Sequence, residues 1–311
     1  MIETRALRKV FTGRRWTVEA LRGVDFTARR GSVTALVGPN GAGKTTLLKI
    51  LSTLILPTSG EAYVDGMDVV SRAAEVRRRI GLVTVSDRLL YYRLSGLENL
   101  TFYGILYGMS VSEARSRARD LLEVVGLGKW GDEPTMHYST GMTRRLAIAR
   151  ALMHDPDVIL LDEPTLGIDA VSSRRVRALV RSLSDGRTVV LTSHMMREVE
   201  ELSDTIYVMR AGQVIARGSP GEIISMAGRV VEAVLRREAV TPELSRFVVR
   251  DDGEKVLLRA PADVVPGDAI EVREVEPTLE DAYVLLAGDG VVDVRPYQFR
   301  RGGAHLRGGP V

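Results

Sequence analysis

The stretch GPNGAGKT, Gly38 to Thr45, restricts the possible folds of this chain more than any other segment. It matches the phosphate-binding pattern G-x-x-x-x-G-K-[ST] at every fixed position. The near-continuous apolar run Ser32–Gly38 leads into it, and Lys44–Leu54 carries apolar residues at helical spacing. Because a strand that is apolar on both faces is typical of a parallel sheet covered by helices, the sequence predicts an α/β fold.

The loop itself predicts a nucleoside triphosphate site. Its glycines allow the backbone to curl so that N–H groups point at anionic oxygens, and the following helix adds the positive end of its dipole. Lys44 is then placed to neutralise the β- and γ-phosphates, and Thr45 to bind magnesium. A glycine-rich turn with a purely structural role is the alternative. The predicted nucleotide contacts are Gly38, Pro39, Asn40, Gly41, Ala42, Gly43, Lys44, Thr45 and Thr46.

Two later predicted strands carry polar residues at their carboxyl ends, where a doubly wound sheet binds its ligands. Asp162 and Glu163 follow four apolar residues, and His194 ends the next strand. Asp162 suits magnesium, usually through water, and Glu163 suits the polarisation of an attacking water. His194 is placed to hydrogen-bond the γ-phosphate or to hold the glutamate and its water. A solvated turn acid and an ordinary structural histidine are the alternatives.

Composition limits the class of protein. With 311 residues, 45% of them hydrophobic and 27% charged, the chain is expected to fold as one large globular domain with an appendage. It has no run of about 18 apolar residues and no apolar signal-peptide core, so the expected location is the cytoplasm. The absence of cysteine excludes disulfides and thiolate metal sites, and a net charge of +3 does not indicate a nucleic-acid partner.

The pattern along the chain predicts three parts. Residues 1–218 form the nucleotide-binding domain, with a mostly helical subdomain at about 95–154. Residues 219–288 contain short strands with partial alternation and then the helical stretch Thr278–Gly288, which predicts a small α+β domain. Residues 289–311 are rich in glycine and arginine, and this tail is expected to be disordered.

A longer segment narrows the class of nucleotide-binding protein. YSTGMTRRLAIARALMHDPDVILLDEP, Tyr138–Pro164, resembles the signature-to-Walker-B block of ATP-binding cassette (ABC) ATPases. LGID, Leu166–Asp169, occupies the place of the family's D-loop, and TSH, Thr192–His194, that of its switch histidine. Five motifs therefore occur in order. The resemblance implies a P-loop NTPase core with a helical signature subdomain, with ATP as substrate, Mg²⁺ as cofactor, and Glu163, His194 and Lys44 as catalytic residues.

The signature YSTGM differs from the family's common LSGGQ at Tyr138, Thr140 and Met142, but retains Ser139 and Gly141. These residues lie where a helix is predicted to begin, which makes a second anion site. In the family two cassettes pack head to tail, so that each signature covers the γ-phosphate held by its partner. The resemblance implies that Ser139 and Gly141 contact ATP across a dimer with a second ABC ATPase subunit, either identical or different.

Two further expectations rest on the family pattern. An aromatic residue before the phosphate loop usually stacks on adenine, and Phe11 matches that position best. Trp16 is the alternative, and either ring could instead belong to the core. The family's metal-contacting glutamine is missing, and its place falls at Val85 or Ser86. We hypothesise that Ser86, or a water that it positions, takes over this contact, with Asp87 one position further on.

The second half of the same loop touches the membrane subunit in the family. Leu89, Leu90, Tyr91 and Tyr92 stand together there beside arginines. They predict a docking surface for an amphipathic helix of a permease. A locally buried loop is the alternative.

These features predict the ATP-hydrolysing subunit of a membrane exporter, which powers a separately encoded permease from the cytoplasmic face of the membrane. The stretch Glu274–Gly288 resembles the appendage of drug- and antibiotic-export cassettes. One alternative is a soluble cassette acting on ribosomes or DNA, which the single cassette and the lack of sustained heptads disfavour. Another is a regulatory cassette without hydrolysis, motivated by the missing glutamine and disfavoured by the retained Glu163 and His194.

Overall fold

A six-stranded, mainly parallel sheet forms the centre of the computed structural model, which describes residues 1–14, 16–84 and 90–288. All neighbouring strands are parallel except β9 and β10, which are antiparallel. Both β7 and β8 are buried along their whole length, as expected for strands covered on two faces. In spatial order the strands are β10 (Gln213–Gly218), β9 (Thr205–Arg210), β3 (Ser32–Val37), β8 (Thr188–Thr192), β7 (Val158–Asp162) and β6 (Ile80–Val83).

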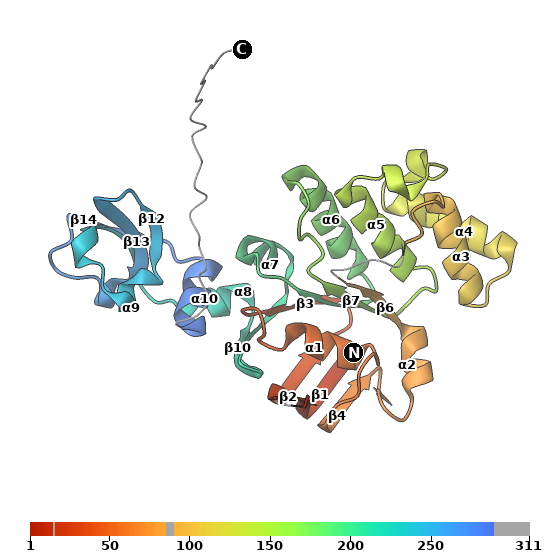
Figure 1. Cartoon of the computed structure of the whole chain (residues 1–311), viewed down its shortest axis with the longest axis horizontal. Helices are drawn as coiled ribbons and strands as arrows, with labels where there is room; N and C mark the ends of the chain where they lie inside the picture. The colour runs from red at the N-terminus through yellow and green to blue at the C-terminus, as the bar shows by residue number, and fades with distance from the viewer. Residues whose placement is uncertain (15, 85–89, 289–311) are drawn as a thin grey trace, which may run out of the picture.

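Helices lie on both faces of this sheet, which confirms the α/β class (Figure 1). α1 lies on one side, and α5, α6 and α7 on the other. Capping boxes at Ser95 and Ser110 begin two helices of the predicted helical segment. The main helices are α1 (Lys44–Leu51), α2 (Ala73–Arg79), α3 (Gly96–Leu106), α4 (Val111–Val124), α5 (Thr140–Ala151), α6 (Ala170–Leu183) and α7 (Met196–Leu202).

A second, antiparallel sheet packs on the α1 side of the central sheet. Its core is continuous with α1 and with Leu160 and Val190 of the central strands. The sequence analysis did not anticipate this sheet. Register shifts interrupt the pairing of β1 with β2, so the period of two that identifies a strand is broken. Its strands are β2 (Thr17–Ala28), β1 (Ile2–Thr12), β4 (Ser59–Val64) and β5 (Met67–Asp68).

A third, antiparallel sheet follows the cassette strands and lies at the left of Figure 1. Most of it is the predicted set of short strands. β14 was not anticipated, because nearly all of its residues are exposed. The elements are β12 (Val248–Asp251), β13 (Lys255–Pro261), β11 (Val230–Arg236), β14 (Glu271–Val275), α8 (Pro220–Ser225), α9 (Pro242–Ser245) and α10 (Leu279–Ala287).

Helix α10 joins the third sheet to the rest of the chain. Leu279 and Tyr283 are buried in the main hydrophobic core, whereas Leu285 packs against the core of the third sheet. Asp281 pairs with Arg259 of β13 at 2.8 Å, and the Ala287 carbonyl accepts from an Arg210 guanidinium of β9 at 3.2 Å. The helix is therefore shared between the two parts, and the domain boundary after residue 218 stays a prediction.

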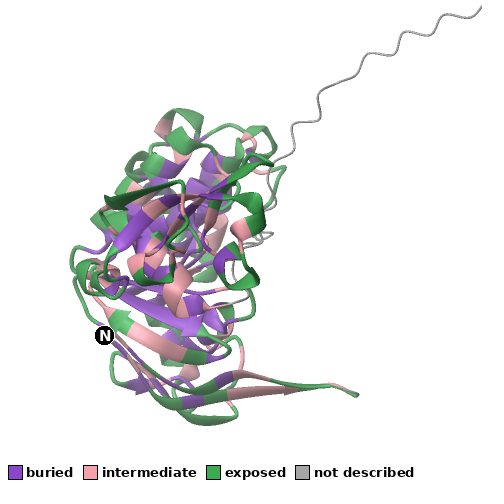
Figure 2. Cartoon of the chain, turned by 90° about the vertical axis from the view of Figure 1, so that its left-hand side faces the viewer, coloured by how far each residue is buried: buried purple, intermediate pink, exposed green. Residues whose placement is uncertain are grey.

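Burial follows the layers (Figure 2): the inner strands β7 and β8 of the central sheet are buried, the edge strand β10 is partly exposed, and the outer helix faces are exposed. Short 3₁₀ turns occupy Gly128–Trp130, Thr135–His137, Arg237–Ala239 and Ala262–Val264. Among the described residues, no helix has the length and apolar character needed to cross a membrane.

Candidate nucleotide-binding and hydrolysis site

The phosphate loop connects β3 to α1, as predicted. Gly38, Gly41 and Gly43 all have positive φ angles, of 156°, 82° and 105°. A Cβ on Gly43 would lie 2.6 Å from the Ala20 carbonyl oxygen, so no other residue fits there without a shift of the backbone. The N-cap residue of α1 is Gly43, which has no side chain to cap the first turn. Its N–H groups are therefore available to an anion.

Lys44 begins α1 and is folded back over the loop. Its ammonium donates to the carbonyl oxygens of Gly38 at 2.6 Å and of Pro39 at 3.1 Å. Burial lowers the pKa of Lys44, and the charges of Glu163 and Asp162 oppose this effect. The loop thus holds one cation next to two carboxylates, at the place where the motif predicts the β- and γ-phosphates.

Three strand and helix ends meet at Asp162. The Thr45 hydroxyl of α1 lies 3.2 Å from both Asp162 carboxylate oxygens, and the Thr192 hydroxyl of β8 donates to Oδ1 at 2.7 Å. A hydroxyl and a carboxylate are oxygen ligands of the kind that Mg²⁺ prefers, and the metal usually adds water and substrate phosphate to them. The residues therefore fit the predicted cation.

Glu163 and His194 are in direct contact, with Nδ1 of the imidazole 2.8 Å from Oε2 of the carboxylate. Glu163 has a φ of 50°, which is unusual for a residue other than glycine. Its backbone N–H donates to the hydroxyl of Thr192 at 3.0 Å and lies 3.2 Å from the Thr192 carbonyl oxygen, which stabilises this conformation. Of the two contacts expected for His194, the structure shows the one with the glutamate.

The signature lies at the start of another helix. The Ser139 hydroxyl accepts from the Met142 N–H at 3.3 Å and caps α5. A Cβ on Gly141 would lie 2.5 Å from the Ser172 side chain, so glycine permits the close packing of α5 on the first turn of α6. Asp169 caps that turn through the N–H groups of Val171 and Ser172. The predicted D-loop and signature are thus neighbours.

Comparisons with known proteins agree with the family that these motifs indicate. Residues 21–166 match the family model described as ABC transporter. The ABC transporter ATP-binding protein NatA of Bacillus subtilis is 40% identical over 210 residues, which are 67% of this chain and 85% of NatA. The chain belongs to the ABC transporter family. The ATPases of this family bind and hydrolyse ATP, so the enzyme class and substrate expected from the motifs are confirmed.

Other ABC relatives cover more of the chain. The daunorubicin resistance ATP-binding protein DrrA3 of Streptomyces coeruleorubidus is 39% identical over 291 residues, 87% of this chain and 92% of DrrA3. The dimeric structure of an ATP-binding cassette in a post-hydrolysis state with ADP and Pi superimposes with a TM-score of 0.64 at 29% identity. It covers 70% of this chain and 98% of that one. The ABC ATPase fold predicted from the sequence is confirmed.

The variant loop of this ABC ATPase is only partly described. Val85, Ser86, Asp87 and Leu89 lie outside the described residues. Leu90 is 3% exposed and belongs to the main core, so the prediction that it forms part of a docking surface is wrong. Its apolar side chain is buried against the helical segment.

The four aromatic residues named in the sequence analysis are exposed or partly exposed. Tyr91 and Tyr92 are 50% and 58% exposed, as a contact surface requires. Phe11 lies on β1 with the Lys9 ammonium 5.0 Å from its ring centre, and Trp16 is 57% exposed. The choice between Phe11 and Trp16 for adenine stacking stays a prediction.

The sequence analysis did not single out two residues that contact the motif residues. Thr192 contacts both Asp162 and the backbone of Glu163, and Glu198 accepts hydrogen bonds from Thr165 and Ser193. Thr192 stands within TSH and was visible as part of that motif. Glu198 carried only a weak signal, a glutamate at a buried position of a short helix.

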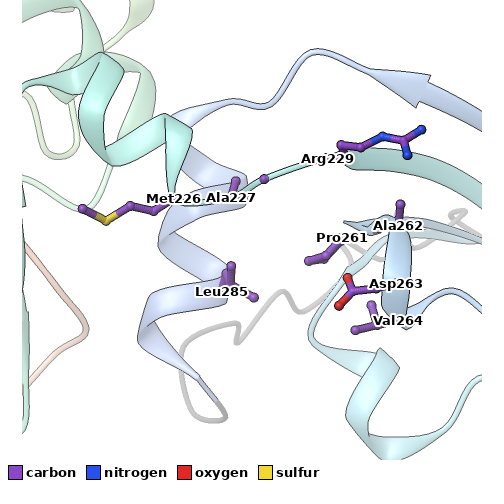
Figure 3. A pocket seen from close by; sticks show the side chains of 9 residues that line it. Met226, Ala227, Arg229, Pro261, Ala262, Asp263, Val264 and Leu285 are labelled. Atoms are coloured by element: carbon purple, nitrogen blue, oxygen red, sulfur yellow. The ribbon is translucent and has the colours of Figure 1, made fainter.

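A cavity of about 650 Å³ lies away from this site, between α8, α10 and the third sheet (Figure 3). Leu285 of α10 faces Asp263 and Val264 across it. Among the described residues that line it, the charged ones are Arg229 and Asp263, and Arg229 pairs with Glu274 at 2.9 Å. Because this lining offers no paired catalytic groups, we assign the chemistry to the edge of the central sheet.

Proposed function

We propose that this chain is the ATP-binding and ATP-hydrolysing subunit of an ABC exporter and powers a separately encoded permease. The observation that best supports ATP hydrolysis is the 2.8 Å contact between His194 and Glu163. This pair lies beside Lys44 and the Thr45–Asp162 pair. Export is supported by the names of the relatives, which include daunorubicin resistance and linearmycin resistance ATP-binding proteins. The DrrA3 similarity extends well beyond the cassette motifs.

Each residue at the sheet edge has a proposed role. The Glu163 carboxylate accepts a proton from the water that attacks the γ-phosphorus, and His194 orients that carboxylate. Lys44 neutralises charge on the β- and γ-phosphates as the bond to the ADP oxygen breaks. The other residues from Gly38 to Thr46 surround the phosphates. All of them except Pro39, which has no N–H group, offer backbone N–H donors, and Thr45 and Thr46 add hydroxyls. Phe11 is proposed to stack on adenine.

Mg²⁺ is the proposed cofactor. Thr45 and Asp162 would hold it, because their oxygens already lie within 3.2 Å of each other. When bound, it would supply positive charge beside the phosphates.

The second partner is proposed to be another ABC ATPase subunit, identical or different. Ser139 and Gly141 at the start of α5 would meet the γ-phosphate of ATP held by that subunit, since a helix N-terminus favours an anion. A related cassette has been solved as a dimer with ADP and Pi, which supports this arrangement.

The proposed organisation places residues 1–218 in the nucleotide-binding domain, with the helical subdomain at about 95–154, and residues 219–288 in an appendage. The tail 289–311 lies outside the described residues. Tyr91 and Tyr92 would contact the permease, which would hold the chain at the cytoplasmic face of the membrane. No nucleic-acid partner is expected.

Purification from detergent-solubilised membranes of the native host tests this function. The tagged chain is expected to be recovered with a polytopic membrane protein that raises its ATPase rate. The double variant Tyr91→Ser/Tyr92→Ser is expected to reduce that recovery, whereas Trp130→Ser, which changes another exposed aromatic residue, is not. Recovery with ribosomes or DNA, and not with a membrane protein, would contradict the proposal.

Ser86→Ala tests the hypothesis for the variant loop. If the Ser86 hydroxyl supports the metal, the variant is expected to need a higher Mg²⁺ concentration for half-maximal ATPase activity, by about tenfold. Ser71→Ala, in the turn before α2, is the matched control. An unchanged Mg²⁺ dependence and rate in Ser86→Ala would rule out this role.

A further inference from the structure

Glu198 is a buried carboxylate next to the proposed catalytic pair. It lies in the first turn of α7 and is 2% exposed. Both of its oxygens accept hydrogen bonds: Oε1 from the Thr165 hydroxyl and Oε2 from the Ser193 hydroxyl, each at 2.7 Å. The same side chain thus contacts two segments that are remote in sequence.

These two segments carry the catalytic pair. Thr165 stands two residues after Glu163, and Ser193 stands between Thr192 and His194. The Ser193 hydroxyl also accepts from the Met195 N–H at 3.1 Å, so it holds the backbone on both sides of His194. A change at Glu198 would therefore be transmitted to His194 through a single residue.

The burial of this carboxylate is costly. Transfer of an ionised carboxylate out of water is unfavourable unless charges or hydrogen bonds compensate for it. Burial raises the pKa of Glu198, while the hydroxyls of Ser193 and Thr165 and the charge of Arg177 act in the opposite direction. Its two close donors are neutral hydroxyls. If this position served only to pack α7 against the core, an apolar side chain would avoid the desolvation cost of a carboxylate.

We propose that Glu198 is a positioning residue for ATP hydrolysis, whose carboxylate joins the loop of His194 to the segment that follows Glu163 and so maintains their contact. This inference rests on the roles proposed above for Glu163 and His194. Glu198 does not itself touch the reacting atoms. Its effect is expected on the rate of hydrolysis and not on the affinity for ATP, because the phosphate loop lies on another element.

Glu198→Gln tests the proposal, because it preserves size but removes the charge and one acceptor oxygen. Its kcat is expected to fall about tenfold, as for other residues that orient a catalytic group, with KM unchanged within about twofold. Glu200→Gln is the matched control, since Glu200 is exposed on the same helix and its change removes the same charge. The control is expected to retain the wild-type kcat.

A double-mutant cycle with His194→Ala separates positioning from general weakening of the fold. If Glu198 acts through His194, Glu198→Gln is expected to cause no further loss of kcat in the His194→Ala background. The same tenfold loss there would overturn the inference, as would a normal kcat in Glu198→Gln alone. A His194→Ala variant with wild-type kcat would instead refute the role proposed for His194.

Thr165→Val provides a second test if Glu198→Gln does not fold. It keeps the volume of the side chain and removes one of the two hydroxyl donors. The proposal is supported if Thr165→Val lowers kcat several-fold in the wild-type background and causes no further loss of kcat in the His194→Ala background. A normal kcat in a folded Thr165→Val protein overturns it.

Discussion

Glu163→Gln is expected to lower the kcat for ATP hydrolysis by about 10²–10⁴-fold, the range for removal of a general base. The amide keeps the size of the carboxylate but cannot take a proton from water. ATP affinity is expected to change little, because the carboxylate lies beside the loop and not within it. Steady-state phosphate release and equilibrium binding of ATP measure the two quantities separately.

The variant is also expected to accumulate as an ATP-bound dimer, since hydrolysis would no longer release the two subunits. Size-exclusion chromatography with and without ATP measures this change. Glu200→Gln removes an exposed carboxylate from the neighbouring α7 and is the control for loss of charge. A Glu163→Gln protein that hydrolyses ATP at more than a tenth of the wild-type rate would contradict the assignment of Glu163 as base.

Lys44→Ala is expected to weaken ATP binding by about 100-fold or more. The buried ammonium is the cation that the loop holds closest to the proposed phosphate position, and hydrogen bonds to charged groups contribute about 1.5–3 kcal/mol each. Two such bonds to phosphate oxygens account for this loss. Isothermal titration with ATP, in the presence and absence of Mg²⁺, gives the affinity directly.

Lys49→Ala is the matched control, because Lys49 lies on the exposed face of the same helix. It removes the same charge from α1 and is expected to leave ATP affinity within about twofold of the wild type. Equal losses of affinity in both variants would mean that the net charge of α1, and not the position of Lys44, determines binding.

Much of the central sheet could be predicted from local pattern. The apolar runs of β3, β7 and β8 are buried on both faces, and such runs bounded by glycine or polar residues are recognisable without knowledge of the partner strands. The helix α6 carries local signals of the same kind, an aspartate cap at Asp169 and a regular spacing of its buried apolar residues. The site residues at the strand ends followed from the direction of the parallel strands.

Other elements depend on long-range contacts and could not be predicted in this way. The sheet of β1, β2 and β4 has interrupted registers, and exposed β14 is paired along β11. Leu90 stands among aromatic residues that are exposed, and only the packing of the helical segment shows that it belongs to the core. In these cases the local sequence pattern is weak, and the contacts that stabilise them, with β4, with β11 and with the main core, appear only in the folded structure.

The sequence by itself determined the chemistry of this protein: the residues of a phosphate loop, a carboxylate pair and a histidine, each at the end of a recognisable strand. Only the tertiary structure decided how these groups contact one another. The distances from His194 to Glu163 and from Thr45 to Asp162 depend on the pairing of β3, β7 and β8. The role of Glu198 depends on the packing of α7, which brings its carboxylate to the nearby Ser193 hydroxyl and to the Thr165 hydroxyl, 33 residues away along the chain. Hydrogen bonds between distant segments leave no periodic trace in a single sequence, and the fold alone brings their atoms within reach.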